Sequence, residues 1–180
     1  MPRYIAFLRA INVGGHMVKM EALRAHFASL GLSEIETFIA SGNVIFQSAS
    51  KSAPALEKKI AARLQTALGY AVATFVRSNV ELAALAGYRA FPAGEIEVNG
   101  SGLYIGFLAS ELKPERRQKL MSLRSALDEF HVHGREVHWL CRTKFSDSKF
   151  SGGLLEKILG VPITFRNANT VRKLAAKYPG

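Results

Sequence analysis

Apolar residues along the chain fall into short runs that alternate between strand-like and helix-like spacing. Residues 3–9 carry apolar side chains on both faces, which is typical of a strand in the middle of a sheet covered on both sides. Residues 20–30 then repeat apolar positions at helical spacing. The elements predicted after this helix are two strands (35–39 and 43–47), a helix that ends at Gly69, a strand (71–77) and a short helix (79–86).

The second half of the chain repeats this order. The segment Tyr4-Ile5-Ala6-Phe7-Leu8 returns as Tyr104-Ile105-Gly106-Phe107-Leu108, and Thr74-Phe75 returns as Thr164-Phe165. Such a long period indicates the duplication of a whole unit. The predicted elements are strand 103–109, a helix from Lys113 with Leu120, Leu123 and Leu127 buried, a hairpin of strands 129–133 and 136–141 across Gly134-Arg135, a helix between Ser151 and Gly160, strand 161–166 and helix 169–177.

Each half therefore has the order β-α-β-β-α-β followed by a short helix. This order predicts an α+β protein made of tandem duplicated ferredoxin-like modules, over residues 1–88 and 102–180, with residues 89–101 as a connector. A sheet with two helices on one face leaves its other face open. The two-sided apolarity of residues 3–9 and 103–109 predicts that the other module covers this face, or a second copy of the chain in a homodimer.

Four ordered motifs resemble those of a bacterial family catalogued as domain of unknown function 1697. Two departures from its pattern are Ala10, where the family usually has glycine, and Ala40, where it often has a polar residue. The resemblance implies a duplicated ferredoxin-like fold and no particular activity. The motifs are Leu8-Arg9-Ala10-Ile11-Asn12-Val13-Gly14-Gly15, Ser41-Gly42-Asn43-Val44-Ile45-Phe46, Ser148-Lys149-Phe150 with Leu155-Glu156-Lys157 and Leu159-Gly160, and Phe165-Arg166-Asn167-Ala168-Asn169-Thr170-Val171.

Charge and composition narrow the choice of partners. The formal net charge of the 180 residues is +10, shared equally between the halves, which favours anionic partners, although the charges are scattered as on an ordinary solvated surface. No apolar run approaches the ~20 residues that span a bilayer, and the N-terminal residues do not resemble a secretory signal. The single cysteine, Cys141, fits a reducing compartment, so we expect a cytoplasmic protein without membrane contact.

The loop after the first strand is the strongest candidate for ligand binding. Gly14 and Gly15 allow close backbone approach just before a helix, whose first N–H groups attract anions. Arg9, Asn12 and Lys19 could add hydrogen bonds to a phosphate or carboxylate. The loop has neither a P-loop nor a dinucleotide fingerprint, and an ordinary strand-to-helix turn also explains the glycines.

Three further polar segments lie where a strand or loop meets a helix. Each has an ordinary explanation as turn or cap chemistry, and capping by Asn169 or Thr170 would leave Arg166 and Asn167 unused. Together with the first loop, they are predicted to line one polar cleft between the duplicated halves. Their candidate residues are Ser41, Asn43, Lys149, Arg166, Asn167 and Asn169.

The predicted hairpin brings three histidines to one face. With a two-residue turn, His131 lies opposite His138 and His133 opposite Glu136, and these side chains could hold zinc. The outer face of an alternating hairpin is polar in any case, and we favour that explanation over a metal site. The opposite face of the hairpin is predicted to be the core face, with Phe130, Val132, Val137 and Trp139. Cys141 has the parity of Val137 and Trp139, which predicts a buried thiol.

The sequence therefore favours a protein that binds a small anionic ligand. The first alternative is an RNA- or DNA-associated module, suggested by the basic charge but without an RNA-recognition signature. The second alternative is a metal- or phosphate-dependent enzyme, for which the sequence identifies no nucleophile, general base or cofactor.

Overall fold

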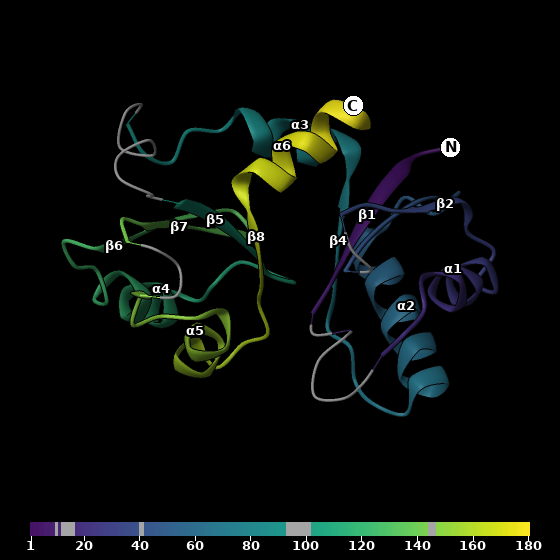
Figure 1. Ribbon diagram of the computed structural model, residues 1–180, viewed down its shortest axis with the longest axis horizontal. Helices are drawn as coiled ribbons and strands as arrows, with labels where there is room; N and C mark the ends of the chain where they lie inside the picture. Colours follow the sequence, from purple (N-terminus) through teal and green to yellow (C-terminus); the bar gives the residue numbers. More distant parts are fainter. Residues whose placement is uncertain (10, 12–16, 40–41, 93–101, 144–146) are drawn as a thin grey trace. The chain divides into compact units, whose positions relative to one another are not determined.

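The computed structural model contains two four-stranded antiparallel sheets and, among the residues that it describes, six α-helices (Figure 1). It describes residues 1–9, 11, 17–39, 42–92, 102–143 and 147–180. The chain forms two compact units. The first comprises Met1–Leu85 with Lys173–Gly180, and the second comprises Ala86–Arg172. An α+β class with roughly duplicated halves is therefore confirmed.

The sheet of the first unit has the strand order β2-β3-β1-β4, and every neighbouring pair is antiparallel. Two helices pack on one face of it, where Leu23 and Phe27 of α1 and Ile60 of α2 join Ala6 of β1 in a common core. The elements are β1 (Arg3–Leu8), α1 (Met20–Ala28), β2 (Ser33–Thr37), β3 (Asn43–Gln47), α2 (Ala53–Leu68) and β4 (Thr74–Ser78).

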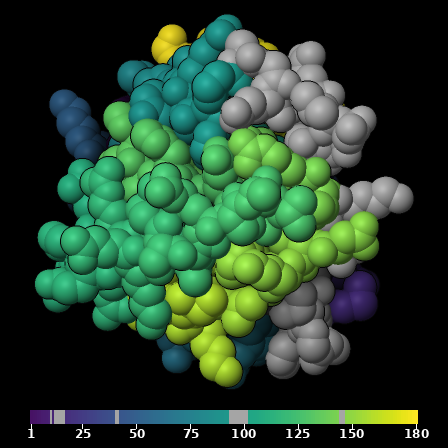
Figure 2. Space-filling view, turned by 90° about the vertical axis from the view of Figure 1, so that its left-hand side faces the viewer, coloured from purple at the N-terminus to yellow at the C-terminus, as the bar shows by residue number. Residues whose placement is uncertain are grey.

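The sheet of the second unit has the equivalent order β6-β7-β5-β8, again with antiparallel neighbours. Residues of this unit, drawn in green and yellow-green, form most of the surface in Figure 2. Trp139 is fully buried under the helices, and its indole N–H donates to Asp128 Oδ1 at 2.9 Å. The elements are β5 (Gly102–Phe107), α4 (Pro114–Met121), β6 (Asp128–His133), β7 (Glu136–Cys141), α5 (Gly152–Leu159) and β8 (Thr164–Asn167).

A short helix follows the last strand of each sheet: α3 (Asn79–Gly87) after β4, and α6 (Ala168–Lys177) after β8. Ser78 caps α3: its hydroxyl accepts from the Glu81 N–H at 3.1 Å, and the Glu81 carboxylate accepts from the Ser78 N–H at 2.8 Å. This reciprocal pair is a capping box. It starts the helix immediately after the strand.

The first helix of each unit has the same kind of ends. Lys19 and Lys113 are the N-cap residues of α1 and α4, and neither side chain makes a capping hydrogen bond in the described structure. Ser29 and Ser122 are the C-cap residues, and each hydroxyl donates to the carbonyl three residues earlier. The correspondence between the two units therefore extends to helix ends whose surrounding sequences share no visible motif.

The second helix of each unit also has matching ends. Ser52 caps the start of α2 and Ser151 caps the start of α5. Each serine hydroxyl accepts a hydrogen bond from the backbone N–H of the residue three positions later. Gly69 and Gly160 end these helices in the left-handed conformation, with φ of 80° and 68°. The predicted ends at both glycines are confirmed, because this conformation suits glycine.

Burial confirms the two-sided pattern of the first strand, since every residue from Tyr4 to Leu8 is at most 4% exposed. The predicted buried stripe of α4 is wrong at Leu127, which is 52% exposed. The helix ends at Met121, and the Ser125 hydroxyl then accepts from the N–H groups of Leu127 and Asp128 to form a turn into β6. Serine competes with helical hydrogen bonding in this way.

Candidate functional site

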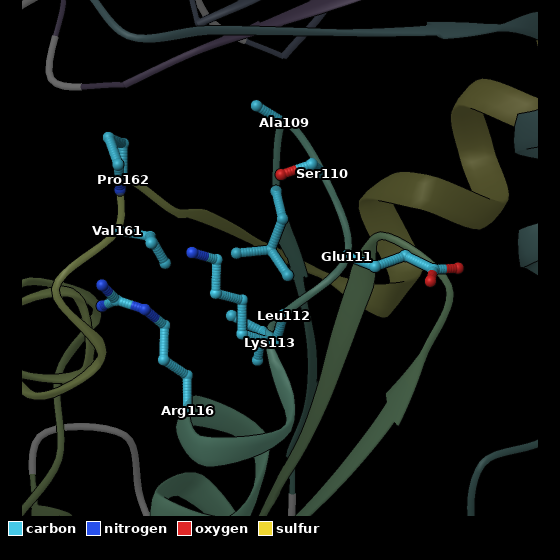
Figure 3. Close-up of a pocket in the computed structure, with 9 residues that line it drawn as sticks. Ala109, Ser110, Glu111, Leu112, Lys113, Arg116, Val161 and Pro162 are labelled. Atoms are coloured by element: carbon cyan, nitrogen blue, oxygen red, sulfur yellow. The ribbon is translucent and has the colours of Figure 1, made fainter.

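A pocket of about 330 Å³ opens in the second unit, beyond the end of β5 (Figure 3). Its walls come from two stretches of chain that are far apart in sequence: the segment that leads from β5 into α4, and the segment between α5 and β8. The lining residues are Leu108, Ala109, Ser110, Glu111, Leu112, Lys113, Arg116, Val161 and Pro162.

Two cations lie in this pocket. The side chains of Lys113 and Arg116 both extend to the side where Val161 and Pro162 lie, whereas Glu111 points away from them (Figure 3). Lys113 is exposed and Arg116 is half-buried. Since the acidic side chain of the lining is turned away, positive charge dominates this side of the pocket, and it attracts anions.

The start of α4 adds to this positive character. Pro114 occupies the first position of the helix, and the first helical bond runs from the Arg117 N–H to the Lys113 carbonyl at 3.0 Å. The N–H groups of Glu115 and Arg116 therefore precede the helical ladder, as at every helix start. Such groups can donate to an anion if one is present.

Arg116 is anchored at the end of α5. Its Nη1 donates to the carbonyl of Leu159, the last residue of that helix, which satisfies a carbonyl that has no partner within the helix. Gly160 follows, and a Cβ atom there would lie 2.6 Å from Arg116 Nη1. Glycine at this position therefore serves the left-handed turn and also leaves space for the guanidinium.

Three of the predicted ligand residues lie in described parts of the first unit. Arg9 continues the pairing of β1 with its backbone, whose N–H donates to the Ala73 carbonyl at 2.9 Å. Lys19 is exposed at the start of α1. Asn43 is buried, and its amide Nδ2 donates to the Phe38 carbonyl at 3.0 Å, so it has a structural role in the β2–β3 connection. The remaining candidates, Asn12, Gly14, Gly15 and Ser41, lie outside the described residues.

Arg166 is used within its own strand. Its Nη1 donates to Thr164 Oγ1 at 2.8 Å and to the Phe165 carbonyl at 2.9 Å. Burial lowers the pKa of its guanidinium to about 10, which leaves it protonated at neutral pH. It does not line the pocket beside Lys113.

The other three candidates of the second unit also lie away from that pocket. Asn167 Oδ1 accepts the N–H of Asn169 at 2.8 Å, so the expectation that capping leaves Asn167 unused is wrong. Asn169 Oδ1 in turn accepts from Arg172 at 2.9 Å. Lys149 is exposed, with its amino group 5.2 Å from the centre of the Phe150 ring.

Sequence reasoning missed Ser110 and Arg116, and it treated Lys113 only as a helix start. The repeat itself carried the signal that could have found them. The loop after Leu8 is the strongest candidate of the first half, and Leu8 corresponds to Leu108 in the second half. Applying the same argument to the second copy would have indicated the segment from Ala109 to Lys113.

The histidine face forms as predicted, since His131 pairs with His138 and His133 pairs with Glu136. Tyr88, a residue that the sequence did not indicate, lies on this face. Its ring stacks on His133 with centres 4.0 Å apart, and its hydroxyl is 2.7 Å from His131 Nε2.

The histidines do not form a metal centre in the described structure. Among the described residues, no three His, Cys, Asp or Glu side chains are arranged to hold a metal ion. His138 is 1% exposed, and its Nε2 has no hydrogen-bond partner among those residues. Burial, followed by the nearby imidazoles of His131 and His133, lowers the pKa of His138 to about 4, so this side chain is neutral at pH 7. Cys141 is buried, as predicted.

Comparison with known proteins supports the overall fold. A solved structure described as "the structure of conserved bacterial protein SP0830 from Streptococcus pneumoniae" is similar over 100% of this chain and 99% of that one, with a TM-score of 0.78 and 25% sequence identity. No curated protein matches the chain. None of the described helices has both the length and the apolar character needed to cross a membrane. A family model matches residues 1–138, and the chain therefore belongs to the family described as "Protein of unknown function (DUF1697)".

Proposed function

We propose that this protein binds a small phosphate- or carboxylate-bearing ligand in the pocket that contains Lys113 and Arg116. One observation carries this proposal: two cations from one helix start extend into the same pocket, and its acidic residue points away. Hydrogen bonds between ionised partners are about twice as strong as neutral ones, which suits such a pair to an anion. The sequence-based hypothesis places the ligand between the halves, whereas this pocket is lined by the second unit alone.

We also infer that each unit is a ferredoxin-like module. The order β2-β3-β1-β4, with helices α1 and α2 on one face, supports this for the first unit, and β6-β7-β5-β8 with α4 and α5 supports it for the second. In such a module the loop after the first strand and the start of the following helix lie together at the C-terminal end of that strand. The pocket beyond β5 lies at such a junction.

A second hollow, in the first unit, offers weaker support for anion binding. It has a volume of about 280 Å³, and Lys59 is the one cation among its described lining residues. The Lys59 amino group donates to the Leu30 carbonyl at 3.0 Å, which ties it to the end of α1. The pocket with two cations is therefore the better candidate.

The nucleic-acid alternative has less support. Modules that bind RNA on a sheet stack bases on exposed aromatic side chains. Phe7 and Phe107, on the central strands of the two sheets, are fully buried, and their neighbours Ile5 and Ile105 are also buried. The enzymatic alternative has no specific observation in its favour: the one carboxylate among the described lining residues, Glu111, points away from Lys113 and Arg116 (Figure 3).

Titration with inorganic phosphate, followed by NMR chemical shifts of the backbone amides, tests the proposal. We expect shifts around the start of α4, and a loss of affinity of roughly tenfold or more in Lys113→Gln and in Arg116→Gln, since a hydrogen bond to a charged group contributes about 1.5–3 kcal/mol. Lys119→Gln is the matched control, because it removes the same charge from an exposed site in the last turn of the same helix. Equal losses in all three variants would mean that phosphate senses net charge and not this pocket.

A further inference from the structure

The lining of the basic pocket is divided between charge and apolar surface. Five of its nine residues are apolar: Leu108, Ala109, Leu112, Val161 and Pro162. In Figure 3, Val161 and Pro162 lie beside the ends of the Lys113 and Arg116 side chains. A ligand whose anionic group reaches these cations would therefore also meet an apolar wall.

Three of the five apolar residues belong to the protein core or pack against it. Leu108 is fully buried and belongs to the core under the sheet, and Leu112 and Val161 pack against that core. Side chains held in this way keep their positions, because protein interiors are close-packed. The part of the wall formed by Leu112 and Val161 is therefore a preformed surface, whereas Ala109 and Pro162 extend it as exposed residues.

The volume also exceeds what an inorganic ion needs. At about 330 Å³, the pocket lies at the lower end of the range of about 300–1,000 Å³ found for small-molecule sites. Such sites are mostly apolar, with a few polar groups that fix the orientation of the ligand. The composition of this pocket follows the same rule.

From these observations we infer that the natural ligand is an organic anion, with its phosphate or carboxylate joined directly to an apolar ring or branched aliphatic body. This inference rests on the proposed function, because it assumes that Lys113 and Arg116 bind the anionic group. The apolar body lies against Leu112, Val161 and Pro162. Removing this body and wall from water supplies affinity that an inorganic ion cannot gain.

Three probes separate the charged and apolar contributions: inorganic phosphate, phenyl phosphate and benzyl alcohol. We expect phenyl phosphate to bind at least about tenfold more tightly than inorganic phosphate, and benzyl alcohol to bind far more weakly than phenyl phosphate. The measurement is the same NMR titration for each probe, with affected amides at the start of α4 and around Val161.

Val161→Thr tests the wall with a nearly isosteric change that adds a hydroxyl group. We expect it to weaken phenyl phosphate severalfold and to leave inorganic phosphate unchanged. Leu154→Thr is the control, because Leu154 is an exposed residue of α5 that does not line the pocket. Thermal melting of both variants checks that they fold.

The outcomes distinguish the inference from the proposed function. Equal affinities for phenyl phosphate and inorganic phosphate, both sensitive to Lys113→Gln, would overturn the inference and leave anion binding in place. Benzyl alcohol binding as tightly as phenyl phosphate, or no binding of either phosphate, would overturn the proposed function and the inference with it.

Discussion

The two units differ along one row of four side chains that crosses each sheet on the face without helices. Paired residues share a face, and the strand registers align the two rows position by position. In the first unit the row is Glu36, Ile45, Ile5 and Arg77, and in the second unit it is His131, His138, Ile105 and Arg166.

Both ends of the row keep the same contacts in spite of these differences. At one end, Arg77 and Arg166 each donate to the carbonyl of the preceding residue, at 3.0 and 2.9 Å. At the other end a tyrosine hydroxyl meets the edge strand: Tyr178 donates to Glu36 Oε2 at 2.6 Å, and Tyr88 lies 2.7 Å from His131 Nε2. Corresponding hydrogen bonds are therefore present at both ends of the two rows, although Glu36 of the first row is replaced by His131 in the second.

The centre of the row shows the energetic effect of exchanging an apolar residue for a polar one at a buried position. Ile45 is fully buried and apolar, whereas His138 is equally buried and leaves Nε2 without a partner among the described residues. An unsatisfied buried polar atom costs free energy that an aliphatic side chain does not. The second sheet tolerates a polar group where the first has none, so the two sheets should respond differently to mutation and to pH.

The largest expected effect comes from placing the histidine in the first unit. Ile45→His removes buried aliphatic surface and buries an imidazole between Ile5 and Glu36. We expect the free energy of unfolding to fall by about 3 kcal/mol, combining a lost core side chain with an unsatisfied polar group. Urea denaturation at pH 7.5 measures it, and an unchanged midpoint would show that the two sheet centres are interchangeable.

Acid pH should destabilise the second unit through His138. The folded protein takes up this proton near pH 4, whereas the unfolded chain takes it up near pH 6.5. The free energy of unfolding therefore falls as the pH drops from about 6.5 to about 4, by up to about 3 kcal/mol at 1.36 kcal/mol per pKa unit. The pKa of His131 is lowered too, mainly by burial, which adds to the same trend.

The matching variant for this pH effect is His138→Ile, which gives the second unit the isoleucine that the first unit has at the corresponding position, Ile45. We expect a gain of about 1 kcal/mol at pH 7.5, because the unsatisfied atom is removed. Its stability should then depend less on pH between 6.5 and 4. An undiminished pH dependence in this variant would assign the acid sensitivity to other groups.

A smaller effect separates the two helix-ending glycines. Gly160→Ala and Gly69→Ala place a side chain in the left-handed conformation, at a cost of about 1 kcal/mol each. At Gly160 the new Cβ approaches Arg116, whereas no atom of the described residues lies within 4 Å of the corresponding position at Gly69. We therefore expect both variants to lose stability and Gly160→Ala alone to lose phosphate affinity, as phosphate titration would measure.

The smallest expected effects concern the two tyrosines. Tyr178→Phe and Tyr88→Phe each remove one partly exposed hydrogen bond, for a loss of about 0.5–1.5 kcal/mol. The Tyr178 hydroxyl is the main reason that the pKa of Glu36 is lowered, ahead of the contribution of Lys177. We expect the pKa of Glu36 to rise in Tyr178→Phe and to stay unchanged in Tyr88→Phe, which a carboxyl NMR titration can resolve.

Local sequence patterns were sufficient to predict most elements of the fold. Glycines at 69 and 160 and the serine at 151 mark helix ends, because their preferred conformations and hydrogen bonds involve only neighbouring residues. Period-two alternation placed Trp139 in the core and His138 on the opposite face, since successive side chains of a regular strand point to opposite faces of the sheet. Leu127 was misplaced because an apolar residue at helical spacing does not show that the helix continues.

By itself, the sequence determined the α+β class, the similar order of elements in the two halves and the faces of the strands, because these follow from the spacing of residues within each element and from the order of the elements. Only the tertiary structure decided which polar side chains gather. Arg116 reaches a pocket because the end of α5, 43 residues along the chain, supplies a carbonyl for its guanidinium. Tyr88 lies on the histidine face through a contact of the same sequence separation. Contacts between distant segments depend on how whole elements pack, and no local pattern of apolar and polar residues records that packing.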